Sequence, residues 1–205
     1  MSEERADAEL LRSIAEGDVR AVGELYDRYS ATLFPIALRI LRERSEAEDM
    51  LHDAFVAVSE RASQYVPERG SVIAWLVTLV RNLSIDRTRR RGRRETLARE
   101  VLSHEPPASV RDPERLTSES GEREKIRRAL AALPEAQRQT LEVAFFEGLS
   151  YPEIAARENV PLGTIKSRAA RALAALRDAL AKEGVVLEAA ALEARQGRQG
   201  PGKSG

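Results

Sequence analysis

Apolar residues recur along most of the chain at the three- and four-residue spacing of amphipathic helices, and strand-like alternation is absent. The pattern predicts helices over 6–16 and 19–42 and a third that begins at Ser45. Pro35 lies inside the second helix and is expected to kink or split it. Ser45, followed three residues later by Glu48, fits a capping box at the start of the third.

A fourth helix is predicted from the apolar run 71–80, with Ser71 as its N-terminal cap. The run is about half of the ~20 residues that a bilayer span needs, which favours a buried helix. It continues into the stretch RNLSIDRTRRRGRR, 81–94, in which seven arginines accompany one aspartate. Asp86 can pair with Arg90 one turn later.

From about residue 95 the helical pattern fades into a stretch rich in Pro, Ser, Thr and Asp. We therefore expect a first domain over 1–94, a linker over 95–122, a second domain over 123–182 and a disordered tail over 183–205. In the second domain, helices over 123–133 and 135–147 precede a short helix from Ser150, a turn at 159–163 and a longer helix from Thr164. The predicted fold class is all-α: two small helical domains joined by a flexible linker, the second domain a helix-turn-helix.

The second helix of this motif has a composition that suits DNA. Its first two turns carry Lys166, Ser167, Arg168, Ala170 and Arg171. In helix-turn-helix proteins the N-terminal residues of the second helix reach base edges in the major groove. Arginine can bond bidentately to guanine, and serine to a base or a phosphate. A solvated surface helix would carry similar charges, so spacing alone leaves both interpretations open.

Composition excludes several other function classes. The chain has no cysteine and two histidines, so thiolate metal sites and disulfides are excluded. Glu48 and His52 stand one turn apart but lack further clustered ligands, and we predict neither a metal, a cofactor nor catalytic residues. The acidic N-terminus has no apolar core of a secretory signal, which favours the cytoplasm. The chain has 33 basic and 33 acidic residues, but 1–80 holds nine basic and 15 acidic ones, an asymmetry that suggests more than one charged partner.

Three segments, in order, resemble sigma factors of the extracytoplasmic-function class. SEAEDMLHDAFVAV resembles the segment that holds the clamp helices of the largest subunit of RNA polymerase. GSVIAWLVTLVRNLSIDRTRRRGRR resembles the region for −10 recognition and strand opening, and LSYPEIAARENVPLGTIKSRAARALAALR resembles the −35 reading region. The resemblance implies a subunit, not an enzyme, that directs core RNA polymerase to promoters and helps to melt them.

The resemblance also implies site residues. The polymerase-binding set is Glu46, Asp49, Asp53 and Phe55. The −10 set is Tyr65, Val66, Pro67, Glu68, Arg69, Arg81, Asn82, Arg87 and Arg90. The −35 set is Thr164, Lys166, Ser167, Arg168, Ala170 and Arg171, although many relatives have a larger side chain at Ala170. Two alternatives stay open: the acidic residues can be an ordinary solvated face, and Tyr65 can pack on the core instead of stacking on a base.

Further partners follow from the same resemblance. They are promoter DNA, both duplex and melted strand, and an anti-sigma factor, which in many relatives is membrane-anchored. The free chain is expected to be a monomer, and its acidic linker to imitate nucleic acid near the RNA exit path. The competing interpretation is a stand-alone helix-turn-helix regulator that binds duplex DNA as a dimer. That interpretation leaves the first domain unexplained.

Overall fold

The computed structural model describes residues 3–101 and 121–183, and within these ranges every regular element is helical. The chain divides into two compact units, Met1–Leu116 and Thr117–Gly205. The all-α, two-domain prediction is thus confirmed. Most of the predicted linker, and all but the first residue of the predicted tail, lie outside the described residues.

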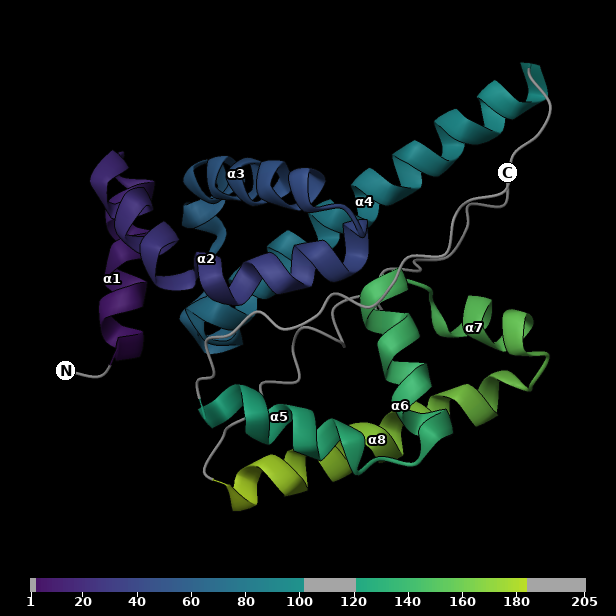
Figure 1. Cartoon of the computed structure of the whole chain (residues 1–205). Coiled ribbons are helices and arrows are strands. Elements are labelled where there is room, and N and C mark those ends of the chain that lie inside the picture. The colour runs from purple at the N-terminus through teal and green to yellow at the C-terminus, as the bar shows by residue number, and fades with distance from the viewer. Residues whose placement is uncertain (1–2, 102–120, 184–205) are drawn as a thin grey trace, which may run out of the picture. The chain divides into compact units, whose positions relative to one another are not determined.

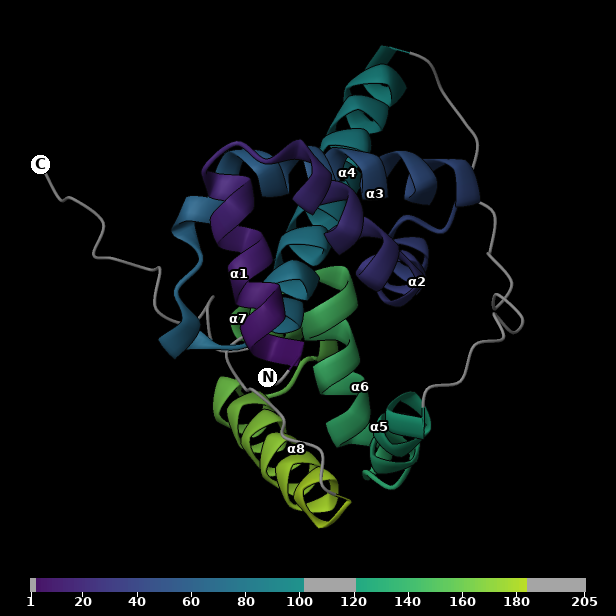
Figure 2. The same ribbon diagram turned by 90° about the vertical axis from the view of Figure 1, so that its left-hand side faces the viewer.

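The first unit is built around its second helix. Its elements are α1 (Glu3–Ala15), α2 (Val19–Leu41), α3 (Arg44–Arg61), the 3-10 turns η1 (Ala62–Gln64) and η2 (Pro67–Arg69), and α4 (Val72–Val101). Helix α2 packs against α1, α3 and α4. Helix α4 continues past Arg94, where the first domain was expected to end, and its last turns extend beyond the other helices of the unit (Figure 1 and Figure 2).

The apolar faces predicted from the sequence meet in one core. Each helix contributes side chains at helical spacing, among them Leu11, Leu25, Leu33, Leu41, Leu51, Val58, Leu76 and Val80. These leucines and valines are almost fully buried, and burial of such a side chain stabilises a fold by about 1.5–3 kcal/mol. The polar Ser84 is also buried on α4, and its hydroxyl donates to the carbonyl of Val80 at 2.8 Å.

Helix α2 begins at the predicted Val19 and ends at Leu41, one residue before the predicted end. Asp18 caps its start by accepting from the backbone N–H of Arg20 at 2.9 Å. Arg42 ends it in the left-handed conformation, φ 65°, and donates its N–H to the Leu38 carbonyl. Pro35 does not split the helix, contrary to one of the two outcomes expected for it. Leu33 and Ala37, on either side of Pro35, are fully buried, and this packing offsets the hydrogen bond that proline cannot donate.

The capping box predicted at Ser45 is wrong. Helix α3 begins one residue earlier, at Arg44, with Glu43 at the cap position and no side-chain cap. Ser45 therefore lies inside the first turn, and its hydroxyl donates to the Glu43 carboxylate at 2.5 Å. Glu48 pairs with Arg44 at 2.8 Å instead of reaching back to a backbone N–H. The predicted cap of α4 is confirmed, because Ser71 Oγ accepts from the N–H of Ala74 at 3.4 Å.

A buried carboxylate fastens the first helix to the second. Asp7 on α1 is almost fully buried and accepts from both Arg28 and Tyr29 on α2. A buried charge is tolerated when it is paired and hydrogen-bonded, as here. Arg28 also pairs with Glu24 one turn before it, at 2.9 Å. This contact was not foreseen from the sequence, since it joins residues more than twenty positions apart.

The second unit packs three short helical segments on one long helix. They are α5 (Gly121–Ala131), α6 (Glu135–Glu142) with its π-helical continuation (Val143–Glu147), and α7 (Tyr151–Glu158). The long helix is α8 (Leu162–Lys182), which contacts α5, α6 and α7. Near the start of α6, hydrogen bonds from Arg138 and Gln139 lower the pKa of Glu135.

Candidate polymerase and nucleic-acid interfaces

The acidic residues of α3 form an exposed face. Asp49 and Asp53 are 71% and 67% exposed, and Glu46 lies beside them, partly covered. The three follow one another at three- and four-residue steps, so they share one side of the helix. His52 is exposed between the two aspartates and stacks on Tyr26 at 5.7 Å.

Phe55, by contrast, does not lie on this face. It is only 4% exposed, and its ring meets that of Tyr26 edge to face at 4.9 Å. It shares the buried side of α3 with Leu51 and Val58. The sequence signal that separates the two sides was the helical spacing itself. Val56, the next residue, is apolar and 61% exposed.

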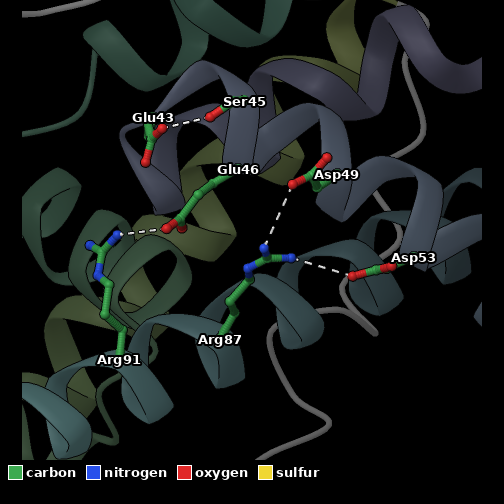
Figure 3. A network of polar contacts seen from close by, with 7 residues as sticks. All are labelled: Glu43, Ser45, Glu46, Asp49, Asp53, Arg87 and Arg91. Carbon is green, nitrogen blue, oxygen red and sulfur yellow. Dashed lines mark hydrogen bonds and ion pairs between the residues drawn. The ribbon is translucent and has the colours of Figure 1, made fainter.

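The acidic face of α3 is already paired with arginines of α4. Arg87 reaches Asp53 at 3.3 Å and Asp49 at 3.9 Å. One turn further along α4, Arg91 reaches Glu46 at 3.3 Å. Figure 3 shows the two arginines pointing from α4 toward the three carboxylates. The sequence assigned the acids and the arginines to separate partners, and only the packing of α3 on α4 brings them together.

The loop between α3 and α4 is closed by Tyr65. Its hydroxyl donates to the Gly70 carbonyl at 2.9 Å, and its ring meets Trp75 edge to face at 6.1 Å. The alternative in which Tyr65 packs on the core therefore describes this structure. Gly70 has φ 142°, a backbone conformation that favours glycine. The turn that Tyr65 closes, Pro67–Arg69, is exposed, and Val66 is half-buried.

The polar residues of α4 differ in accessibility. Arg81 is only 5% exposed, and it donates to the side-chain oxygen of the half-buried Asn82 at 3.0 Å. Arg81 is therefore placed to orient Asn82 and not to meet a phosphate. Arg90 is exposed, and within the described part of the chain the expected pair of Asp86 with Arg90 is not formed. Trp75 packs against the core.

The helix-turn-helix is formed by α7 and α8. Ser150 caps α7 in a complete capping box: its hydroxyl accepts from the N–H of Glu153, whose carboxylate accepts from the N–H of Ser150 at 2.6 Å. Asn159 ends α7 in the left-handed conformation, φ 53°. Ile154 and Ile165 are fully buried where the two helices meet. These local features fix the angle at which α8 leaves the turn.

The residues predicted to meet the −35 element fall into two groups. Lys166, Ala170 and Arg171 are exposed on α8, whereas Thr164, Ser167 and Arg168 are half-buried. The Ser167 hydroxyl donates to the Thr164 carbonyl at 3.0 Å. Helix α8 begins at Leu162, two residues before the predicted start, so all six lie within its first three turns.

Two acidic residues of the motif were not foreseen. Glu158, at the end of α7, pairs with Arg168 of α8 at 2.7 Å. Glu147, the last residue of the π-helical continuation of α6, pairs with Arg157 of α7. A sequence gives no direct sign of such pairs, because each spans the bend between two elements. Glu158 thereby orients Arg168, a residue of the predicted −35 set.

The described residues show neither a membrane-spanning helix nor a metal centre. Within 3–101 and 121–183, every helix is too short or too polar to cross a membrane. Over those ranges, His, Cys, Asp and Glu also form no group of three or more that could hold a metal ion.

Comparison with known proteins agrees with this layout. Residues 25–94, in the first unit, match the family model for Sigma-70 region 2, and residues 123–176, in the second unit, match that for Sigma-70, region 4. The ECF RNA polymerase sigma factor SigK of Mycobacterium sp. (strain KMS) is 33% identical over 175 residues, which cover 83% of this chain and 89% of the relative. SigK of Mycobacterium tuberculosis (strain ATCC 25618 / H37Rv) is 32% identical over 173 residues, 83% of this chain and 91% of the relative.

Among solved structures, the chain is similar to Rhodobacter sphaeroides SigE in complex with the anti-sigma ChrR. The identity is 31% and the TM-score 0.43, and the match covers 86% of this chain and 99% of that chain. The sequence relatives span most of both chains, and the two sigma regions fall in the two compact units. The protein therefore belongs to the ECF family of RNA polymerase sigma factors.

Proposed function

We propose that this sigma factor docks on core RNA polymerase with the acidic face of α3, reads the −35 duplex with α8, and reads the melted −10 strand with the α3–α4 loop and α4. The observation that supports this division most directly is the presence of regions 2 and 4 in separate compact units of one chain. Membership of the sigma-factor family establishes the general activity, which is promoter-specific initiation of transcription.

The polymerase-docking surface is proposed from charge and exposure. Asp49 and Asp53 are the most exposed carboxylates of the face, and they would meet a basic coiled coil of the largest subunit. Complementary charge of this kind speeds and orients association. In place of the buried Phe55, we propose Val56 as the apolar contact at this surface, because it is exposed three residues beyond Asp53.

The −10 surface is proposed around the loop that Tyr65 closes. Val66 and the exposed turn Pro67–Arg69 present backbone groups to which a flipped base could hydrogen-bond. Asn82 would reach the same strand from α4, oriented by Arg81, and Arg90 would neutralise a phosphate. Binding of unstacked bases would supply the free energy of melting.

The −35 surface is proposed at the start of α8. Lys166, Ala170 and Arg171 are exposed, and they would face base edges in the major groove. The half-buried Ser167 would meet a base edge beside them, whereas Thr164 and Arg168 would contact phosphates, with Arg168 held in direction by Glu158. The N-terminus of α8 itself favours a phosphate.

Other partners are proposed on the family resemblance alone. We propose that the chain acts in the cytoplasm, is a monomer when free of partners, and is restrained by an anti-sigma factor. Neither a cofactor nor a metal is required by this function, and no catalytic residue is proposed.

The function is tested by mixing the purified chain with core RNA polymerase and a promoter library. We expect transcripts from promoters that share one −35 and −10 pattern. Duplex binding without core binding would instead support a stand-alone regulator. To test melting, Asn82→Ala holoenzyme is probed with permanganate on a duplex promoter. Unchanged reactivity of the bubble would contradict the role of Asn82.

A further inference from the structure

The contact between α3 and α4 joins the two proposed surfaces of the first unit. Arg87 belongs to the predicted DNA-binding set, and Asp49 and Asp53 to the predicted polymerase-binding set. In the structure the guanidinium of Arg87 lies between these two carboxylates, at 3.9 and 3.3 Å (Figure 3). The same charges are thus available either to each other or to external partners.

The geometry leaves this contact accessible. The side chains of Asp49 and Asp53 are about two-thirds exposed, at 71% and 67%, and that of Arg87 is 35% exposed. A cationic partner can therefore approach the carboxylates from solvent without unfolding either helix. Once the partner has bound the two carboxylates, the attraction that holds Arg87 over α3 is lost. The long side chain of Arg87 can then adopt other rotamers.

We propose that Arg87 is an internal counter-ion that competes with core RNA polymerase for Asp49 and Asp53, and that docking on the polymerase releases it for the promoter strand. This inference rests on the proposed docking surface. Because coupling free energies are reciprocal, an arginine that weakens polymerase binding must itself be withheld from DNA in the free chain. The device would favour DNA binding by the holoenzyme over binding by the free subunit.

The expected size of the effect is small. Exposed ion pairs contribute modestly because water and salt screen them. Loss of the Arg87 pair should therefore change the equilibrium constant for polymerase binding, and that for DNA binding, by roughly 1.5- to 5-fold each. The effect should also shrink as salt is raised, since the Debye length is about 10 Å at 0.1 M and falls further above it. Measurements at low and high salt therefore belong to the test.

The competition is tested by titrating labelled full-length chain with core RNA polymerase. Arg87→Ala should bind core roughly 1.5- to 5-fold more tightly than wild type. Arg93→Ala removes the same charge from the same helix at an exposed position that, in the described part of the chain, makes no ion pair. Arg93→Ala should leave core affinity unchanged. Equal effects of the two substitutions would overturn the competition.

A double-mutant cycle tests whether the aspartates carry the effect. In an Asp53→Asn background, Arg87→Ala should gain less than half of the affinity that it gains in wild type. A gain that persists in full would mean a general charge effect and would overturn the proposal. An Asp53→Asn chain that binds core as tightly as wild type would instead contradict the docking surface itself, so the two failures are distinguishable.

The release is tested with single-stranded −10 DNA at low ionic strength. Arg87→Ala should weaken binding by the holoenzyme more than binding by the free chain. Arg90→Ala, which removes an exposed arginine with no acidic partner among the described residues, should weaken both equally. Equal penalties of Arg87→Ala in the free chain and in the holoenzyme would overturn the release step.

Discussion

At the scale of single residues, burial decides which predicted contacts can meet a partner. Phe55 and Val56 are neighbours on α3, yet the first is in the core and the second is exposed. Tyr65 and Arg81 are likewise committed within the fold, one to Gly70 and the other to Asn82. They hold in place the loop and the Asn82 side chain that we propose as readers of the −10 strand.

Phe55→Ala should destabilise the first unit. A large aromatic side chain leaves a cavity when it is truncated, and the cost is about 3–5 kcal/mol. The free energy of unfolding is measured by urea titration followed by the fluorescence of Trp75, the one tryptophan of the chain. Val56→Ala is the matched control: it should change stability by less than about 0.5 kcal/mol and weaken core binding. Equal stability losses would contradict the assignment of Phe55 to the core.

Tyr65→Phe separates the structural role of Tyr65 from stacking. Phenylalanine keeps the ring but loses the hydrogen bond to Gly70, so the free energy of unfolding should fall by about 1 kcal/mol. Promoter opening, measured with permanganate, should fall with it, because the loop is no longer closed. Tyr26→Phe is the control, since the described structure gives the Tyr26 hydroxyl no hydrogen bond. Full opening by Tyr65→Phe would favour a stacking role.

At the scale of elements, the same local sequence signal predicted one helix cap correctly and another wrongly. Ser150 and Glu153 are three residues apart and form a capping box, whereas Ser45 and Glu48 have the same spacing and do not. The difference is that the cap position of α3 is Glu43, two residues before Ser45, whereas that of α7 is Ser150 itself. Helix existence and buried faces follow from periodicity, but the exact first residue depends on what precedes it.

Ser150→Ala should therefore loosen α7. Loss of an N-cap costs about 1 kcal/mol. In the variant the N–H of Glu153 loses its acceptor, the Ser150 hydroxyl, and only the bond from the N–H of residue 150 to the Glu153 carboxylate remains. Amide hydrogen exchange over residues 151–158 should accelerate by roughly fivefold if opening is local. Ser45→Ala, which removes a serine that caps nothing, should leave exchange in α3 within about twofold. The same acceleration in both helices would contradict the assignment of the caps.

The arginine-rich end of α4 shows what periodicity could not predict. The sequence identified a basic stretch behind an apolar helix and an acidic face on α3, and both are present. Nothing local indicates that Arg87 and Asp53, 34 positions apart, face each other. The same holds for Glu158 and Arg168 across the helix-turn-helix bend. Ion pairs that form only when two helices pack together are the part of the candidate site that a single sequence does not predict.

At the scale of the whole molecule, the division into two units predicts that promoter contacts can be lost separately. Arg171 is exposed on α8 in the second unit, and Asn82 is held on α4 in the first. Arg171→Ala should weaken holoenzyme binding to a full promoter by roughly tenfold, as expected for the loss of one base contact. It should have little effect on a template whose −35 sequence has been replaced. Asn82→Ala should weaken opening on both templates.

The control for Arg171 lies on the same helix. Arg177 is also exposed, but it stands nearly two turns further from the start of α8, beyond the segment that enters the groove. Arg177→Ala removes the same charge and should lower affinity on both templates equally, through the general attraction to phosphates. A template-independent loss from Arg171→Ala as well would mean that Arg171 contributes only charge. Base reading would then have to be assigned to Lys166 and the residues beside it.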